Sequence, residues 1–128
     1  MMNVFLAEDD PLMSGIYEKA LRLAGFDMTM ALDGELAIEA LKAADQKPAV
    51  VVLDIMMPKK SGLDVLAEMK KDDQLKGIPV VLLTNLAGSD DVKKGIELGA
   101  ISYLVKSQVG PQEIADRVKE VYEKYAKK

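Results

Sequence analysis

The sequence predicts an α/β protein in which short parallel strands alternate with helices. Five apolar or β-branched runs, at residues 4–7, 26–31, 49–53, 79–83 and 101–105, are separated by segments of helical pattern. The run at 49–53, Ala-Val-Val-Val-Leu, lacks polar alternation, which is typical of a central strand covered on both faces. We therefore expect a (βα)5 domain whose parallel sheet lies between two layers of helices.

The expected helices have ordinary start and stop signals. They cover residues 11–24, 34–44, 63–74, 89–98 and 111–126. Residues suited to helix ends flank them: prolines for the first turn (Pro11, Pro111), N-caps (Asp33, Ser89) and left-handed glycines after the last turn (Gly25, Gly99). Gly95 lies inside the fourth helix, where it should cost about 1 kcal/mol relative to alanine. We expect that helix to be the least stable.

Length and composition exclude several functions. A chain of 128 residues forms one domain, so we expect a single domain over residues 1–128 without an output domain. Its net charge of -4 and few aromatic residues offer no basic or stacking surface, so direct binding of nucleic acid is not expected. Cysteine and histidine are both absent. Any phosphoryl-donor histidine must therefore come from a partner.

The first residues contain no targeting signal. Met1, Met2 and Asn3 lead into a short apolar stretch and then into acidic residues, without a basic segment or a cleavage-like site. No apolar run approaches the roughly 20 residues that span a bilayer. We expect a soluble cytoplasmic protein that does not insert into membranes.

Polar residues follow four of the expected strands. In chain order they are Glu8, Asp9 and Asp10, then Asp54, then Thr84, then Lys106. Because the carboxyl ends of parallel strands meet at one edge of a sheet, these side chains should lie together. Carboxylates that converge repel one another unless a hard cation is bound, and oxygen ligands without histidine or cysteine favour magnesium. Asp54 beside a metal, Lys106 and Thr84 is suited to phosphoryl transfer.

Each of these residues also has a simpler explanation when it is taken alone. Asp54 could be a turn residue, Lys106 a surface side chain, and the acidic run at 8–10 a helix cap. Thr84 could likewise be an N-cap and Tyr103 an immobile, half-buried ring. A functional site is favoured because four such residues fall at the same edge of one sheet.

The whole chain resembles a CheY-like response-regulator receiver domain of bacterial two-component signalling. The resemblance rests on AEDD after the first strand, LDIMMPKKSG around Asp54, LLTN after the fourth strand and YLVKS at the fifth. Pro58 and Gly62 match the turn residues of the loop after Asp54. The resemblance implies the flavodoxin-like three-layer sandwich, with strand order 2-1-3-4-5.

The resemblance also implies the chemistry of the site. Asp54 would accept a phosphoryl group from a phosphohistidine on a sensor histidine kinase or a histidine phosphotransfer protein. Mg2+ would be bound directly by Asp9 and Asp54, through water by Glu8, and by the backbone carbonyl of Met56. Lys106 would bridge the phosphoryl group.

The remaining implied roles concern signalling. Thr84 and Tyr103 would form the switch pair and would alter the surface made by the fourth helix, the fifth strand and the fifth helix. A stand-alone receiver would then signal to a downstream protein target. Beyond its own phosphorylation and slow dephosphorylation we expect no enzyme activity. We expect a monomer, with a phosphorylation-dependent dimer as the alternative.

Three positions depart from the family pattern. The residue after the fifth-strand lysine is usually a proline joined by a cis peptide, but here Ser107 follows Lys106, which leaves a strained cis or a trans bond open. The residue after the switch threonine is usually small, but here it is Asn85, which could crowd or hydrogen-bond the phosphoryl pocket. Ile101 and Ser102 precede the switch tyrosine, where DNA-binding regulators of the family usually have acidic residues. This difference argues against the ion-paired dimer that those regulators form through their last two helices and fifth strand.

Other functions are compatible with part of the pattern. An unphosphorylated pseudo-receiver has the same fold, but here every residue of the active pattern is present. A haloacid-dehalogenase-like phosphohydrolase would have a second aspartate where this chain has Met56, and a flavin-binding protein would have no acidic run after the first strand. The apolar Met56 and Leu86 cannot orient an attacking water, so we expect a long-lived phosphoryl group.

Overall fold

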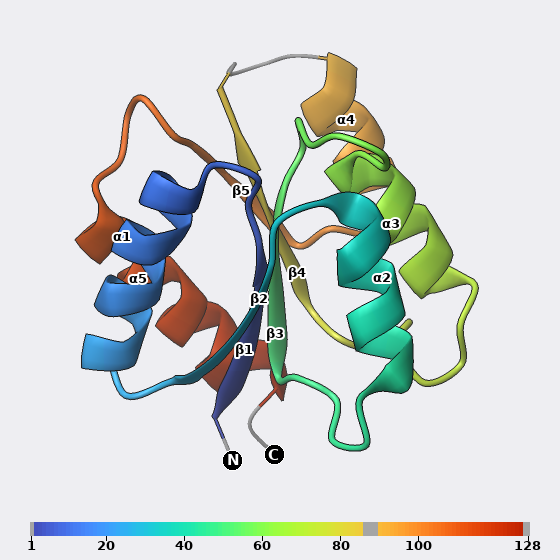
Figure 1. Ribbon diagram of the computed structural model, residues 1–128, viewed down its shortest axis with the longest axis horizontal. Helices are drawn as coiled ribbons and strands as arrows, with labels where there is room; N and C mark the ends of the chain where they lie inside the picture. Colours follow the sequence, from blue (N-terminus) through green and yellow to red (C-terminus); the bar gives the residue numbers. More distant parts are fainter. Residues whose placement is uncertain (1, 86–89, 127–128) are drawn as a thin grey trace.

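The computed structural model describes residues 2–85 and 90–126 and contains a five-stranded parallel sheet (Figure 1). The strands are β1 (Asn3–Ala7), β2 (Asp27–Ala31), β3 (Val50–Asp54), β4 (Val80–Thr84) and β5 (Ser102–Val105). Their order across the sheet is β2-β1-β3-β4-β5, and every neighbouring pair is parallel. The predicted fold class and strand order are confirmed, and each strand lies within one residue of its predicted bounds.

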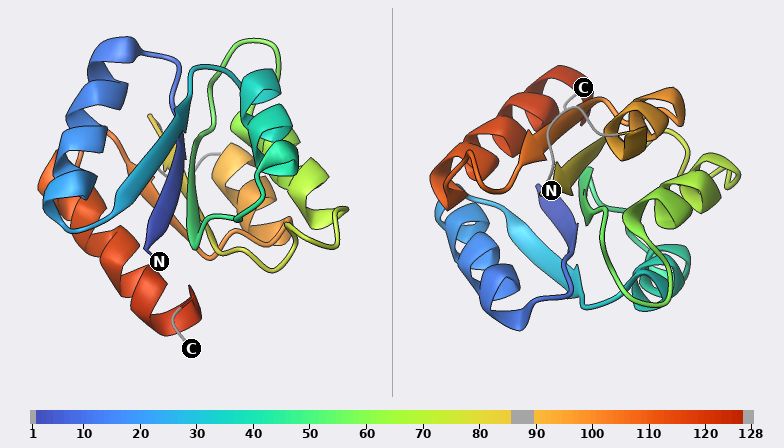
Figure 2. Two further views of the ribbon diagram at one scale, coloured as in Figure 1. Left: turned by 60° about the horizontal axis from the view of Figure 1, so that its bottom comes forward. Right: turned by 90° about the horizontal axis from the view of Figure 1, so that it is seen from above.

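The helices form a layer on each face of the sheet, as the two views of Figure 2 show. They are α1 (Pro11–Leu23), α2 (Gly34–Ala43), α3 (Gly62–Lys70), α4 (Asp90–Glu97) and α5 (Pro111–Val121). Helices α1 and α5 cover one face, while α2, α3 and α4 cover the other (Figure 1). None of the helices in the described ranges is long and apolar enough to span a membrane.

The sheet divides the core into two apolar clusters because side chains alternate between its faces. Val50 and Val52 pack in the cluster that contains residues of α1 and α5. Val51 and Leu53 pack in the cluster that contains residues of α2 and α3. All five residues of β3 are buried, as the unbroken apolar run predicts. Asp54 therefore ends a strand that cannot shift without exposing both clusters.

Most of the predicted helix ends are confirmed. Asp33 caps α2 by accepting a hydrogen bond from the backbone N–H of Leu36 at 2.8 Å. Gly25 and Gly99 have left-handed φ angles of 101° and 110°. Ser89, the other predicted N-cap, lies outside the described residues.

The predicted end of α3 is wrong. The sequence pattern extends this helix to residue 74, but it ends at Lys70. Beyond that point the backbone N–H of Asp72 bonds to the carbonyl of Met69, three residues earlier. The Asp72 carboxylate then accepts a hydrogen bond from the N–H of Gln74 at 2.8 Å. Aspartate readily forms such turns, and this one replaces the next helical turn.

The last helix has its predicted extent but not a uniform geometry. The α-helical part ends at Val121, and the π-helical turn Tyr122–Ala126 follows. Within this turn the Tyr122 ring meets Phe26 edge to face, with 5.9 Å between ring centroids. The contact joins the end of the chain to the segment before β2.

Two helical glycines permit close packing. A Cβ atom at Gly95 would overlap the buried side chain of Leu82, so the absent side chain lets α4 lie directly on β4. A Cβ atom at Gly62 would overlap the carbonyl oxygen of Asp54. The Gly62 N–H also donates to the carbonyl of Ile55 at 3.0 Å. The start of α3 is thus in direct contact with the backbone that carries Asp54.

We predict that Gly62→Ala destabilises the fold by about 2 kcal/mol or more, because the added methyl group meets backbone atoms that cannot move independently. The matched control is Gly15→Ala in α1, where an added Cβ has no neighbour within 4 Å. That control should stabilise the protein by about 0.5–1 kcal/mol through helix propensity. Urea unfolding of the two variants measures both effects, and equal stability of the two would contradict the packing argument.

Candidate active site

The acidic residues expected at the carboxyl edge of the sheet do converge. Glu8 follows β1 and donates its backbone N–H to the carbonyl of Ala31 at 3.1 Å, while Asp54 ends β3. One carboxylate oxygen from each of Glu8, Asp9 and Asp54 lies within 4.8 Å of the others. Glu8 is fully buried and Asp54 is 2% exposed, whereas Asp9 is exposed. Two of the three charges are therefore largely removed from solvent.

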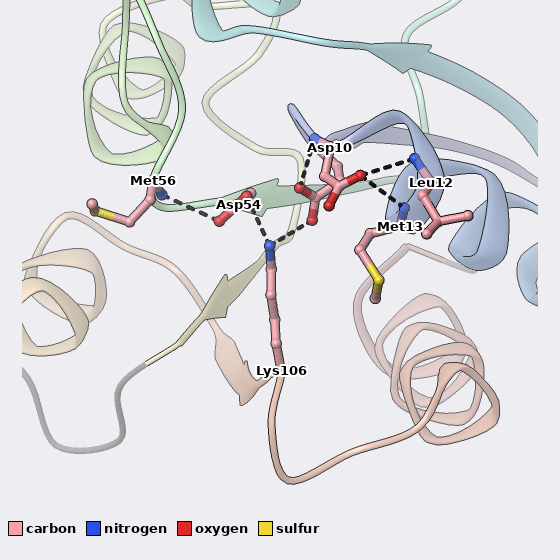
Figure 3. Close-up of polar contacts among 7 residues, drawn as sticks. Asp10, Leu12, Met13, Asp54, Met56 and Lys106 are labelled. Carbon is pink, nitrogen blue, oxygen red and sulfur yellow. Dashed lines mark hydrogen bonds and ion pairs between the residues drawn. The ribbon is translucent and has the colours of Figure 1, made fainter.

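Lys106 follows the edge strand β5, and its side chain extends to Asp54 (Figure 3). Its backbone N–H donates to the carbonyl of Thr84 at 2.7 Å, which fixes the start of the loop after β5. Its ammonium group lies 2.8 Å from Asp54 Oδ2 and 2.6 Å from Glu8 Oε1. The lysine side chain is 14% exposed. One cation thus contacts the ends of two different strands.

The surroundings of Asp54 make its ionisation unfavourable. Burial raises the pKa of Asp54 to about 7, and the nearby Glu8 carboxylate also raises it, although Lys106 opposes both effects. Burial lowers the pKa of Lys106, but its contacts with Asp54 and Glu8 outweigh this effect and leave the pKa raised. The lysine therefore stays protonated, and Asp54 exchanges its proton near neutral pH.

The donor set fits a hard divalent cation. Three carboxylates face one ammonium group, so the cluster keeps an excess of negative charge when all three are ionised. Glu8 Oε1 accepts no hydrogen bond from the described residues, and its negative charge is compensated by the ion pair with Lys106. All the available ligands are oxygens, which Mg2+ prefers. The acidic cluster thus fits a magnesium site.

An open pocket of about 490 Å3 lies over these groups. It is lined by Glu8, Asp9, Asp10, Met13, Asp54, Met56, Asn85, Lys106 and Ser107. The backbone N–H of Met56 donates to Asp54 Oδ1 at 3.2 Å, and the Met56 side chain extends away from Asp54 (Figure 3). The backbone N–H of Met56 therefore contacts the carboxylate, whereas the role of its carbonyl as a metal ligand stays a prediction.

The other predicted residues occupy different places around the site. Thr84 ends β4 and is 4% exposed, whereas Tyr103 on β5 is 38% exposed. Asp10 is not in the group of three carboxylates, because its Oδ1 caps α1 by accepting from the N–H of Leu12 at 2.9 Å. The described residues contain no cis peptide bond, so the Lys106–Ser107 bond is trans.

Two features near the site were not predicted from the sequence, a residue of the pocket wall and the cap of α3. Met13 forms part of the pocket wall, and its position in the first turn of the helix that follows the acidic run was the available signal. Ser61 and Asp64 form a capping box that starts α3, with Asp64 N–H donating to Ser61 Oγ at 3.1 Å. The Ser-x-x-Asp spacing was a readable signal for this box.

The comparison with protein-family models matches residues 4–119 to the response regulator receiver domain. The chain belongs to this family. Phosphorylation on aspartate and magnesium binding are typical of receiver domains, which are signalling modules of two-component systems. The recognition made from the sequence motifs is confirmed.

Relatives of this receiver include longer proteins. It is 35% identical over 119 residues to the probable transcriptional regulator ycf27 of Porphyridium aerugineum. The match covers 93% of this chain and 47% of that protein. The chain thus spans about half the length of the curated relatives that it matches.

Two solved structures resemble the receiver along nearly its whole length. One is the phosphorylated cyanobacterial phytochrome response regulator RcpA, with 30% identity, a TM-score of 0.85, and coverage of 98% of this chain and 96% of that one. The other is the Mn2+-bound form of the response regulator Rcp1, with 29% identity, a TM-score of 0.81, and coverage of 99% and 96%.

We predict that Asp54→Asn stabilises the receiver at pH 8 in the absence of divalent cations. Because the folded pKa is raised from 3.8 to about 7, the carboxylate weakens the fold progressively as pH rises through that interval. The amide keeps the shape without the charge, so the free energy of unfolding should rise by on the order of 2 kcal/mol. The gain should shrink toward pH 4.

Urea unfolding at both pH values measures this effect. The control is Asp73→Asn, because the Asp73 side chain is 93% exposed and should change stability little at either pH. Mg2+ should stabilise the wild type more than Asp54→Asn, because the variant lacks one carboxylate of the cluster. A variant no more stable than the wild type at pH 8 contradicts the electrostatic argument.

Proposed function

We propose that this receiver accepts a phosphoryl group on Asp54 from a phosphohistidine of a sensor histidine kinase or phosphotransfer protein. The observation that carries the proposal is the contact of Asp54 Oδ2 with Lys106 at 2.8 Å, beside Glu8 and Asp9 and under an open pocket. The 128 residues contain no histidine, so the donor lies outside this domain.

In the proposed reaction a carboxylate oxygen of Asp54 attacks the phosphorus atom. The new O–P bond forms as the N–P bond of the donor phosphohistidine breaks, and the imidazole nitrogen keeps the electron pair. Lys106 offsets negative charge on the phosphoryl oxygens, because its ammonium group already lies beside the attacking carboxylate. The backbone N–H of Met56 orients that carboxylate through Oδ1.

The metal ligands in this proposal are Asp9 and Asp54, with Glu8 acting through water and Met56 through its backbone carbonyl. A bound Mg2+ would supply positive charge to the phosphoryl oxygens. Asp9 is exposed and can adjust to an ion, whereas Glu8 and Asp54 are held by burial and by Lys106. We propose no catalysis beyond the receiver's own phosphorylation and dephosphorylation.

The signal is proposed to leave through the face formed by α4, β5 and α5. Thr84 and Tyr103 would form the switch pair, since β4 and β5 are adjacent strands and Lys106 N–H bonds directly to the Thr84 carbonyl. The output would be a protein contact, because the net charge of -4 disfavours nucleic acid as the direct partner of this domain.

We predict that acetyl phosphate with Mg2+ adds one phosphoryl group to the wild type, as measured by intact mass and Phos-tag mobility. Asp54→Asn should remain unlabelled. Lys106→Met should slow labelling by about 10²-fold, because removing one charge-stabilising donor has that typical effect. Lys119→Met, an exposed position on α5, is the control and should label normally. An unlabelled wild type, or a labelled Asp54→Asn, would refute the proposed function.

The phosphoryl group should be long-lived. The side chain of Met56 is apolar, 64% exposed and directed away from Asp54, so it cannot orient a water molecule for attack (Figure 3). Leu86, the other apolar residue that supports this prediction, lies outside the described residues. Met56→Asn should accelerate loss of the aspartyl phosphate several-fold, whereas Met56→Leu should not. Decay followed after removal of the donor measures this, and equal rates for the two variants would argue against the prediction.

A further inference from the structure

The pocket over Asp54 contains many acidic groups and few hydrogen-bond donors. Four carboxylates line it, those of Glu8, Asp9, Asp10 and Asp54. Among the described residues that line it, those whose side chains can donate an N–H or O–H are Lys106, Asn85 and Ser107. Lys106 already contacts both Glu8 and Asp54, so part of its donor capacity is committed. A phosphoryl group needs further donors for its oxygens.

Strand order places Asn85 on the opposite side of Asp54 from the acidic run. Because β3 lies between β1 and β4, Asp54 separates Glu8 and Asp9 on one side from Asn85 on the other. A metal held by the acidic residues therefore belongs to the β1 side of Asp54. Oxygens of a phosphoryl group that face β4 and β5 are left to donors from the ends of these strands, which are Lys106, the hydroxyl of Thr84 and Asn85.

The end of β4, directly before Asn85, is hydrogen-bonded to the segments that end both neighbouring strands. The N–H of Ile55 donates to the carbonyl of Leu83 at 2.9 Å, and the N–H of Lys106 donates to the carbonyl of Thr84 at 2.7 Å. Asn85 follows directly and is exposed, whereas Thr84 is 4% exposed. A side chain on such a rigid support can offer a hydrogen bond at small entropic cost.

We propose that the side-chain amide of Asn85 donates a hydrogen bond to a phosphoryl oxygen on the β4 side of Asp54. The inference rests on the proposed function and adds a binding residue to it. The amide nitrogen can only donate and carries no charge, so it binds an anion without forming an ion pair with the neighbouring carboxylates.

The test uses beryllium trifluoride with Mg2+ as an analogue of the bound phosphoryl group. Its affinity is obtained by titration, and 19F NMR reports the surroundings of the bound fluorines. Asn85→Leu has a similar volume without the donor, and should weaken binding about tenfold or more, as expected for loss of one hydrogen bond to a charged group. The bound 19F resonances should also shift.

Two further variants separate charge from shape. Asn85→Asp should bind the analogue more weakly than Asn85→Leu, because a carboxylate would repel it. Gln108→Leu changes an exposed residue in the loop after β5 that does not line the pocket, and should bind as the wild type does. The affinity of Asn85→Leu for Mg2+ alone should remain unchanged, because Asn85 is not one of the three clustered carboxylates and follows β4, on the other side of Asp54 from β1.

The outcomes distinguish this inference from the proposed function. If the wild type binds the analogue and Asn85→Leu binds it equally well with unshifted resonances, the role of Asn85 is wrong and phosphorylation of Asp54 stands. If the wild type neither binds the analogue nor takes a phosphoryl group from acetyl phosphate, both proposals fail. Weaker analogue binding together with equally weaker Mg2+ binding would also overturn the role of Asn85, because it indicates a general disturbance.

Discussion

Buried negative charge at the carboxyl edge of the sheet is the constraint on which the rest of the structure depends. Glu8 and Asp54 are nearly inaccessible to solvent, and the Lys106 ammonium group lies within 2.8 Å of both. Removing two like charges from water is costly, so the cluster is tolerable only with a cation in contact. Burial, together with the nearby Glu8 carboxylate, raises the pKa of Asp54, and the excess of negative charge makes the cluster suitable for a divalent metal.

The apolar fold holds these charges in place. β3 is buried on both faces, so Asp54 cannot move along the strand without exposing core side chains. Gly62 lets α3 start against the backbone carbonyl of Asp54, and the backbone N–H of Met56 donates a hydrogen bond to the Asp54 carboxylate. Lys106 is held in turn by the Thr84 carbonyl. Asp54 is therefore paired with β4 and in contact with Lys106 after β5, next to the face proposed to signal.

Much of the fold was predictable because its signals are local. Alternating strand and helix patterns, glycines after helix ends and the Asp33 cap all depend on neighbouring residues. One error arose where a local preference competed with another contact. Asp72 ends α3 early through its own turn, although the helical pattern continues beyond it. That Gly95 makes α4 the least stable helix stays a prediction, and the structure adds that this glycine permits close contact with Leu82.

The sequence by itself determined which residues reach the site, because each follows a recognisable strand and parallel strands end at one edge. The tertiary structure alone decided how those residues interact. It directs the Lys106 side chain to both Glu8 and Asp54, assigns Asp10 to the cap of α1, and places Met13 on the pocket wall. Such differences depend on distances and burial between distant segments, since charges interact according to their separation and their exposure to solvent.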